Sequence, residues 1–295
     1  MDIRTLQYFL AIAREESITK AAGSLNMTQP PLSRQMKDLE EELGKQLFIR
    51  GSKKISLTED GLLLKKRAEE MVALLDKTMH ELTSSEESIA GDILIAAGET
   101  ENISILAKIG KSLNKKYPDI HFKIYSGDSE YVKDKIDNGL VDFGLVIGTV
   151  DLEKYDYIKL PVSDRWGIIM KDTDALAKYD RISSAQLADR PLLLSHQASN
   201  NSEIMSWFQA NKVVPNIITT YNLAYNASVF VKTGFGYMLA LDNILNTAIG
   251  SGLVFRPITP GLKADMYVIW KKNQIFGKAA SIYLDEIKNS IKTTR

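Results

Sequence analysis

Two short helical patterns joined by a turn stand near the start of the chain. Ser17 is placed to cap a first helix over about residues 18–25, because its hydroxyl can accept a free first-turn amide hydrogen. Residues 26–27 follow as the turn, and Thr28 is placed to cap a second helix. The apolar residues of that helix recur at steps of four, three and four: Leu32, Met36, Leu39 and Leu43. Because these positions share one buried face, the pattern predicts a helix-turn-helix.

The start and outer face of the second helix carry a set of candidate recognition residues. They are Thr28, Gln29, Pro30, Ser33, Arg34 and Lys37. Amide, hydroxyl, guanidinium and ammonium groups at the start of a recognition helix can reach base edges in the major groove of DNA. An ordinary helical hairpin with a solvated polar face has the same pattern, so this segment alone leaves both interpretations open.

The flanking segments favour a winged helix. Upstream, an apolar stripe predicts a third helix that completes a small core: Leu6, Phe9, Leu10 and Ala13. Downstream, residues 47–57 read as a two-stranded hairpin with a turn at residues 51–52. The hairpin carries three cations that we expect to contact phosphates or a minor groove: Arg50, Lys53 and Lys54. Residues 1–58 are therefore expected to form a winged helix-turn-helix DNA-binding domain.

A long helix is predicted from Thr58, which is placed to cap it, to about residue 82. Its apolar residues recur at steps close to those of a coiled coil: Leu64, Ala68, Met71, Leu75, Met79 and Leu82. Such a seam indicates a dimer interface, although the internal core of a globular domain gives the same pattern. The small polar run at residues 83–88 predicts a hinge with a domain boundary near residue 88. Residues 59–88 are the expected dimerisation helix and hinge.

Beyond residue 91 strands and helices alternate, which predicts a parallel sheet covered by helices. A first set of elements is expected at residues 93–97, 103–117, 120–125, 131–138 and 143–147. A second set runs through residues 167–170, 192–194, 202–210, 217–221, 224–233, 237–241, 266–270 and 276–292. The fold class expected for this part is α/β.

Polar loops that follow the expected strands are candidate ligand sites, because small ligands bind outside the carboxyl ends of strands in open α/β sheets. The candidates are Gly98, Glu99, Thr100 and Glu101, then Ser126 and Gly127, then Thr149, and finally Ser195 and Gln197. Helix starts use the same residue types as caps, so each residue has a purely structural alternative.

Composition narrows the functional classes. The 295 residues carry 37 basic and 37 acidic side chains, whereas residues 1–58 carry nine and seven, a net charge of +2. So modest a basic charge indicates that several DNA-binding ends act together, and it therefore predicts an oligomer. The chain has no cysteine, which excludes disulfides, thiolate metal sites and a catalytic thiol.

Catalytic, cofactor and membrane signals are not found in the sequence. The three histidines, at positions 80, 121 and 196, are not spaced as metal ligands, and neither a Gly-x-Ser-x-Gly elbow nor a phosphate-binding glycine loop occurs. We therefore expect no enzyme activity, no catalytic residues, no metal and no cofactor. The sequence starts without a signal peptide and has no apolar run of about 20 residues, so we expect a cytoplasmic protein without membrane contact.

A longer pattern runs from Ala21 to Arg50: Ala-Ala-x-x-Leu-x-x-Thr-Gln-Pro-x-Leu-Ser-Arg-x-x-x-x-Leu-Glu-x-x-Leu-Gly-x-x-Leu-Phe-x-Arg. Together with Leu-Thr-Glu-Asp-Gly at residues 57–61, it resembles the signature of LysR-type transcriptional regulators. The resemblance implies that Gln29, Ser33 and Arg34 touch bases or nearby phosphates and that Arg50 and Lys53 serve the wing. Lysine stands at positions 53 and 54, where the family often has arginine, and lysine is a point charge that favours phosphate attraction over base readout.

The resemblance also implies the architecture of residues 89–295. Two α/β subdomains similar to periplasmic binding proteins are expected, the first from about residues 89–160 and 266–295 and the second from about residues 161–265. A small-molecule effector is expected in the cleft between them. Double-stranded DNA is a second expected partner. The chain is also expected to bind copies of itself, forming a homodimer through the long helix and then a homotetramer. A transport protein that binds solutes could use residues 91–295 alone, but the winged helix argues against that class.

Two glutamates flank Thr100 in the first candidate loop. Like charges repel an anion, so the sequence leaves two alternatives for the cleft. Either the cleft prefers a neutral or cationic small molecule, or Glu99 and Glu101 point outward.

Overall fold

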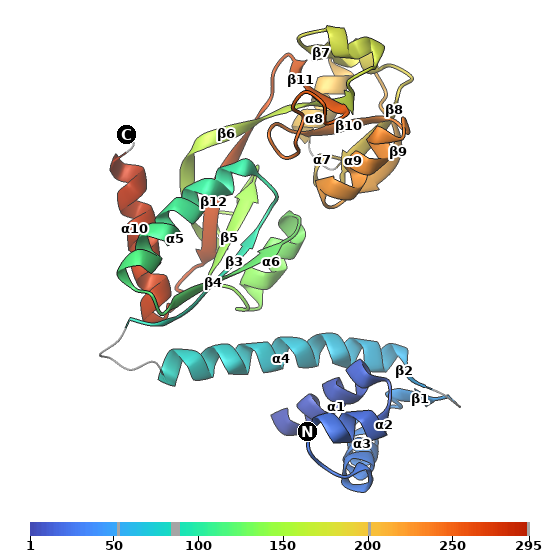
Figure 1. Ribbon diagram of the computed structural model, residues 1–295, viewed down its shortest axis with the longest axis vertical. Coiled ribbons are helices and arrows are strands. Elements are labelled where there is room, and N and C mark those ends of the chain that lie inside the picture. Colours follow the sequence, from blue (N-terminus) through green and yellow to red (C-terminus); the bar gives the residue numbers. More distant parts are fainter. Residues whose placement is uncertain (52–53, 84–88, 200–201, 294–295) are drawn as a thin grey trace. The chain divides into compact units, whose positions relative to one another are not determined.

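The computed structural model describes residues 1–51, 54–83, 89–199 and 202–293. The chain forms two compact units, Met1–Thr83 and Ser84–Arg295 (Figure 1). The expected hinge falls on residues 83–88, most of which lie outside the described residues. The contacts divide the chain about five residues before the boundary expected near residue 88, and they group the long helix with the amino-terminal unit.

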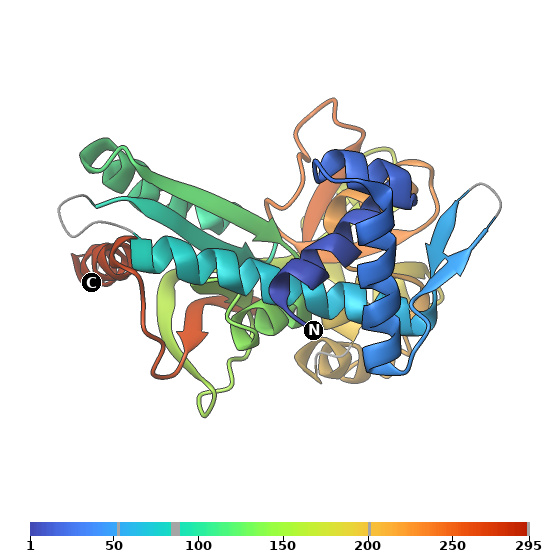
Figure 2. The same cartoon turned by 90° about the horizontal axis from the view of Figure 1, so that it is seen from below.

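The amino-terminal unit is a winged helix-turn-helix with a long helix appended. Its elements are α1 (Ile3–Glu15), α2 (Ile18–Ser24), α3 (Gln29–Leu43), β1 (Phe48–Arg50), β2 (Ile55–Leu57) and α4 (Glu59–Thr83). Antiparallel pairing joins β1 and β2 in the expected hairpin, which stands out at the edge of the helices in Figure 2. A single core contains most of the two expected apolar stripes, with Leu6 and Phe9 packed with Leu32, Met36 and Leu39. Ala13 and Leu43 were also expected there and do not belong to it, and Leu43 is 38% exposed.

The expected caps are confirmed at two of three helix starts. Ser17 accepts a hydrogen bond from the amide of Lys20 at 3.4 Å, and Thr58 accepts one from the amide of Gly61 at 2.9 Å. Thr28 occupies the N-cap position of α3, but its side chain accepts no amide there. A proline in the first turn has already removed a free amide, so this helix start needs less capping.

The stripe on α4 has two different environments. Leu64, Ala68 and Val72 pack on the core of the winged helix, and Ala68 is fully buried. The same face continues along the helix, where Met79 is 52% and Leu82 is 77% exposed within this chain. The two interpretations of the seam thus apply to different halves of one helix: the first half is internal core, and the second half leaves apolar surface uncovered.

The second unit alternates strands with helices as expected. Its strands are β3 (Gly91–Ala97), β4 (Ile120–Ser126), β5 (Phe143–Ile147), β6 (Tyr155–Lys171), β7 (Ile182–Ser183), β8 (Pro191–Ser195), β9 (Asn216–Tyr221), β10 (Tyr237–Leu241), β11 (Leu253–Thr259) and β12 (Lys263–Lys271). Its helices are α5 (Ser104–Lys116), α6 (Ser129–Asp137), α7 (His196–Ser199), α8 (Ser202–Gln209), α9 (Ala224–Lys232) and α10 (Lys278–Thr293), with short 3-10 turns at Glu101–Ile103, Ala175–Lys178 and Ser184–Leu187.

The sheet is mixed, so the expectation of a parallel sheet is confirmed for some strand pairs and wrong for others. The main strand order is β4-β3-β5-β12-β6-β10-β8-β9. β3 is parallel to β4 and β5, and β8 is parallel to β9 and β10. β12 and β6, however, run antiparallel to their neighbours. Alternating apolar positions show where strands lie but carry no information on direction, which is why the sequence pattern could not reveal this.

β6 and β12 connect the two halves of this unit: the first half contains β3, β4 and β5, and the second half contains β8, β9 and β10. The first part of β6 pairs with β12, and its second part pairs with β10 and β11. α5 and α10 cover one face of the first half and α6 covers the other, as Figure 1 shows. Successive residues of β3 therefore face opposite cores, with Ile93 and Ile95 on the α5–α10 side and Ala96 on the α6 side. In the described residues we find no helix both long and apolar enough to cross a bilayer.

Candidate functional site

The turn between α2 and α3 fixes the direction of α3. Ala21 and Ala22 are buried and small, which lets neighbouring helices approach closely. Asn26 adopts a left-handed conformation with φ of +53°, and the amide of Met27 returns to the carbonyl of Ala22 at 2.9 Å. This tight geometry buries one face of α3 and leaves the start of the helix at the surface.

The candidate recognition residues lie on this exposed part of α3. The side chains of Gln29 and Arg34 are exposed and have no hydrogen-bond or charge partner in the described part of the chain, and Ser33 is half-buried. Lys37 is exposed and forms an ion pair with Glu41 at 3.2 Å. Thr28 and Pro30 are exposed at the first turn. A guanidinium and an amide are thus presented to solvent at the start of a helix whose opposite face is buried.

Hydrogen bonds from the backbone amides of the wing hold it to the helices. Glu40 of α3 accepts hydrogen bonds from the amides of Leu47, at 2.6 Å, and Phe48, at 3.1 Å, through one carboxylate oxygen. On the second strand, the amide of Ile55 donates to the carbonyl of Glu16 at 2.9 Å. These contacts hold the two strands of the wing against the helical core.

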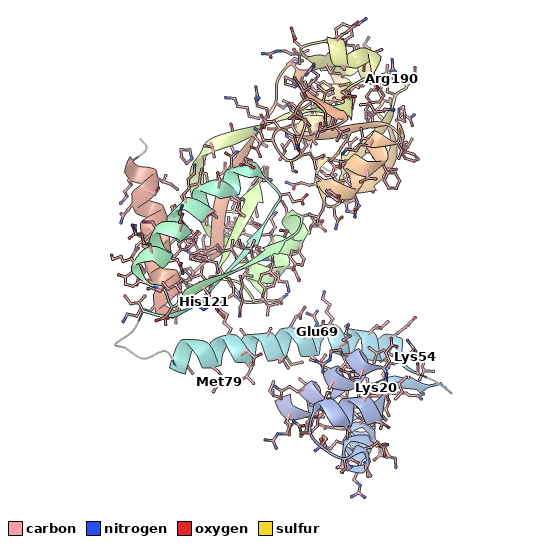
Figure 3. The ribbon with its side chains drawn as sticks, viewed as in Figure 1. Lys20, Lys54, Glu69, Met79, His121 and Arg190 are labelled. Carbon is pink, nitrogen blue, oxygen red and sulfur yellow. The ribbon has the colours of Figure 1, made fainter. Side chains whose placement is uncertain are left out.

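Of the three expected wing cations, Lys54 is the one whose side-chain contact the structure describes. Lys54 forms an ion pair with Glu16, and this contact raises the pKa of the lysine. Figure 3 shows Lys54 beside the start of β2. Arg50 lies at the end of β1, and Lys53 lies outside the described residues. A phosphate would have to compete with Glu16 for Lys54.

A cleft lies between the two halves of the second unit. Its cavity is about 60 Å³, and its lining comes from both halves. From the first half, Glu99 and Asp128 reach it, and from the second half Trp166, His196 and Tyr221 do. Recesses of about 500 Å³ and 230 Å³ adjoin it and share Gln197 as a lining residue.

The structure brings most of the candidate ligand-binding residues to this region. Those that line the cavity are Gly98, Glu99, Gly127, Ser195 and Gln197, and Thr149 lines the adjoining recesses. Glu101 is exposed and, like Ser126, does not line the cavity. Of the two glutamates, Glu99 lines the cleft, whereas Glu101 is exposed outside its lining. The outward-pointing alternative therefore applies to Glu101 alone, and the preference for a neutral or cationic molecule stays a prediction.

Thr100, another candidate ligand residue, is not among the residues that line the cavity. Its side chain is buried, and its hydroxyl donates a hydrogen bond to Asp164 at 2.7 Å. Asn102 donates to the other carboxylate oxygen of Asp164. Burial raises the pKa of Asp164, and these two hydrogen bonds oppose the shift. Thr100 therefore supports β6 behind the cleft and has no hydroxyl hydrogen left for a ligand.

Several cleft residues had no signal in the sequence, and three of them are Trp166, Tyr221 and Ala224. Trp166 belongs to β6, Tyr221 ends β9 and Ala224 starts α9. The hydroxyl of Tyr221 donates to the carbonyl of Leu239 at 2.7 Å, and burial raises the pKa of this tyrosine. In a sequence, apolar and aromatic residues of this kind are interpreted as part of the hydrophobic core. Only the tertiary structure shows that these three residues line the cleft. The described residues contain no group of three side chains that could hold a metal ion.

Comparison with known protein families gives two matches that together span nearly the whole chain. The model described as "Bacterial regulatory helix-turn-helix protein, lysR family" matches residues 3–62, and the "LysR substrate binding domain" matches residues 86–291. The chain belongs to the LysR family. It is a LysR-type transcriptional regulator, with a DNA-binding helix-turn-helix domain and a domain that binds small-molecule effectors.

Curated relatives of this LysR-type regulator are regulators rather than enzymes. The HTH-type transcriptional regulator BsdA of Bacillus subtilis is 29% identical over 242 residues, which cover 80% of this chain and 82% of BsdA. The Hca operon transcriptional activator HcaR of Escherichia coli is 25% identical and is covered over 93% of both chains.

Solved structures share the fold of the regulator. CbnR, a LysR family transcriptional regulator, has a TM-score of 0.76 at 17% identity, covering 99% of both chains. Full-length CbnR complexed with its target DNA has a TM-score of 0.75 at 18% identity, covering 98% of this chain and 100% of CbnR. The expected class of α/β regulator with an amino-terminal winged helix is confirmed.

Proposed function

We propose that α3 enters the major groove of an operator and that Gln29, Ser33 and Arg34 contact bases or adjacent phosphates. The observation that carries this proposal is the exposure of Arg34 and Gln29 at the start of a helix whose other face is buried. A guanidinium can bind guanine through two hydrogen bonds, and helix starts are the part of this motif that reaches base edges. Arg50, Lys53 and Lys54 of the wing then bind phosphates.

The regulator binds DNA as an oligomer in this proposal. Residues 1–58 have a net charge of only +2, so one subunit supplies a modest electrostatic attraction to phosphates. The apolar face at the end of α4, which includes Met79 and Leu82, is covered by a second copy of the chain. Two such dimers form a tetramer. Because its DNA target lies in the cytoplasm of a bacterial cell, the regulator acts there.

The effector acts by shifting a population of cleft shapes. β6 and β12 are the strands that cross between the two halves, so a ligand bound between the halves changes their relative angle around these strands. The subunit contacts transmit this change to the spacing of the winged helices. The operator is then bound in a different geometry when the effector is present.

Substitution of Arg34 tests the base-reading role. If each Arg34 makes one bidentate base contact, Arg34→Ala weakens specific binding by about 5- to 140-fold per subunit, corresponding to about 1–3 kcal/mol. Footprinting and gel retardation on the DNA upstream of the gene measure this, and sedimentation checks that the oligomer is unchanged. Arg34→Lys keeps the charge but loses the planar fork, so it lowers discrimination between operator and random DNA.

Arg14→Ala is the matched control, because Arg14 is exposed near the end of α1 and its removal changes the charge of the same unit by the same amount. This variant is expected to retain discrimination between operator and random DNA. If Arg34→Ala bound the operator as tightly as the unaltered chain does, the proposal that α3 reads bases would be refuted.

A further inference from the structure

Glu99 reaches across the cleft and binds the start of a helix in the other half. It follows β3, and its Oε2 accepts a hydrogen bond from the backbone amide of Ala224, 125 residues away, at 2.7 Å. Ala224 is the first residue of α9, and the side chain of Leu223 at the N-cap position accepts no amide. First-turn amides and the helix dipole favour a negative charge at this point. Glu99 thus provides the carboxylate that the helix lacks in its own sequence.

A second contact ties the two halves together from the opposite direction. Gln197 of α7 donates a hydrogen bond from Nε2 to the carbonyl of Ile147, at the end of β5, at 2.5 Å. Each half therefore sends one side chain to the backbone of the other. The cavity that remains, about 60 Å³, is well below the roughly 300–1,000 Å³ of typical ligand pockets.

The charges in the lining of the cavity itself oppose an anionic ligand, whereas the adjoining recesses include Lys133 and Lys263. Glu99 and Asp128 are the charged side chains in its lining, and no lysine or arginine belongs to the described lining. Asp128 uses one oxygen to accept the amide of Tyr131 at 2.9 Å. A ligand carboxylate would meet two carboxylates of the protein and would find the amide of Ala224 already occupied.

We propose that Glu99 is a resident carboxylate that fills the anion-accepting position at the start of α9 and thereby excludes carboxylate effectors from the cleft. The effector is then a neutral or cationic molecule that donates hydrogen bonds to Glu99 in the cleft that Trp166 and Tyr221 line. This specificity-determining role rests on the proposed effector cleft. It goes further by naming the chemical class that the cleft accepts and the residue that decides it.

Removing Glu99 turns the position into a site for a free carboxylate. In the full-length Glu99→Ala variant, hydrogen exchange at the amides of residues 224–228 is expected to accelerate by about ten- to a hundred-fold, because a charge-assisted hydrogen bond is lost. Sodium acetate is expected to restore the protection in this variant, whereas sodium chloride at the same ionic strength is not. In the unaltered chain, acetate should leave the exchange of these amides unchanged.

Glu101→Ala is the matched control, since Glu101 lies in the same loop, is exposed and does not line the cavity. Its exchange at residues 224–228 should equal that of the unaltered chain, with and without acetate. Glu99→Gln provides a second variant that keeps the size of the side chain, and it should show a smaller acceleration because the amide oxygen still accepts a hydrogen bond. Trp166, Trp207 and Trp270 all lie in this unit, so their emission reports whether each variant is folded.

Two results overturn the proposal. One is that exchange at residues 224–228 in folded Glu99→Ala is the same as in the unaltered chain. The other is that acetate slows the exchange of these amides in the unaltered chain as much as it does in Glu99→Ala. Neither measurement uses DNA, so these results separate failure of the specificity role from failure of the DNA-binding proposal. Operator binding that responds to no small molecule would instead refute effector control and leave the contact between Glu99 and Ala224 in place.

Discussion

Glu40 is expected to be the residue that anchors the wing. One of its carboxylate oxygens accepts the amides of Leu47 and Phe48 at 2.6 and 3.1 Å, so Glu40→Ala leaves both amides without this partner. A hydrogen bond to a charged group stabilises a folded structure by about 1.5–3 kcal/mol. Because Glu40 is partly exposed to solvent, we take the stabilisation of the closed wing by both hydrogen bonds together as about 2–4 kcal/mol. The opening equilibrium of the wing should therefore rise by about 30- to 900-fold.

Hydrogen exchange at the amides of Leu47 and Phe48 measures this opening directly. Tryptophan emission cannot, because every tryptophan of the chain lies after residue 165, in the other unit. That emission serves as an internal control, since it should melt identically in Glu40→Ala and in the unaltered chain. Weaker operator binding should accompany the faster exchange, because the wing carries Arg50 and Lys54.

Two further variants separate the cause. Glu40→Gln keeps an oxygen acceptor without the charge, and neutral hydrogen bonds are roughly half as strong, so about half of the effect is expected. Glu41→Ala removes only an exposed ion pair with Lys37, which contributes about 0.3–0.5 kcal/mol. Exchange at Leu47 and Phe48 that is the same in Glu40→Ala and Glu41→Ala would refute the anchoring role.

Three other substitutions test the oligomer and the pH response. Leu82→Glu should split the dimer in sedimentation, because it places a charge on the uncovered face of α4, whereas Ala73→Glu on the charged face should not. The contact with Lys54 holds the pKa of Glu16 below its ordinary value of 4.5, so this pair stabilises the winged helix above that pH and the stabilisation is lost as the pH falls through the lowered pKa. Glu16→Gln should flatten this dependence in melting curves followed by circular dichroism between about pH 3 and 6, and an unchanged slope would disprove the assignment.

Local periodicity was sufficient for the amino-terminal unit. Leu32, Met36 and Leu39 recur at helical spacing, and they are buried together. A helix places residues three and four apart on one face whatever the rest of the chain does, so both the core face and the exposed face with Arg34 follow from sequence alone. The division of the α4 stripe does not follow, because its spacing is regular while the winged helix covers only its first half.

The cleft depended on contacts between distant residues. The sequence placed Glu99 in a loop after a strand, and that much depends only on local pattern. Whether its carboxylate faced solvent or the amide of Ala224 was decided by the pairing of β6 with β12 and β10, which sets the two halves against each other. Strand order and direction arise from pairing between segments far apart in the chain, and the alternation of apolar residues within one strand does not encode them.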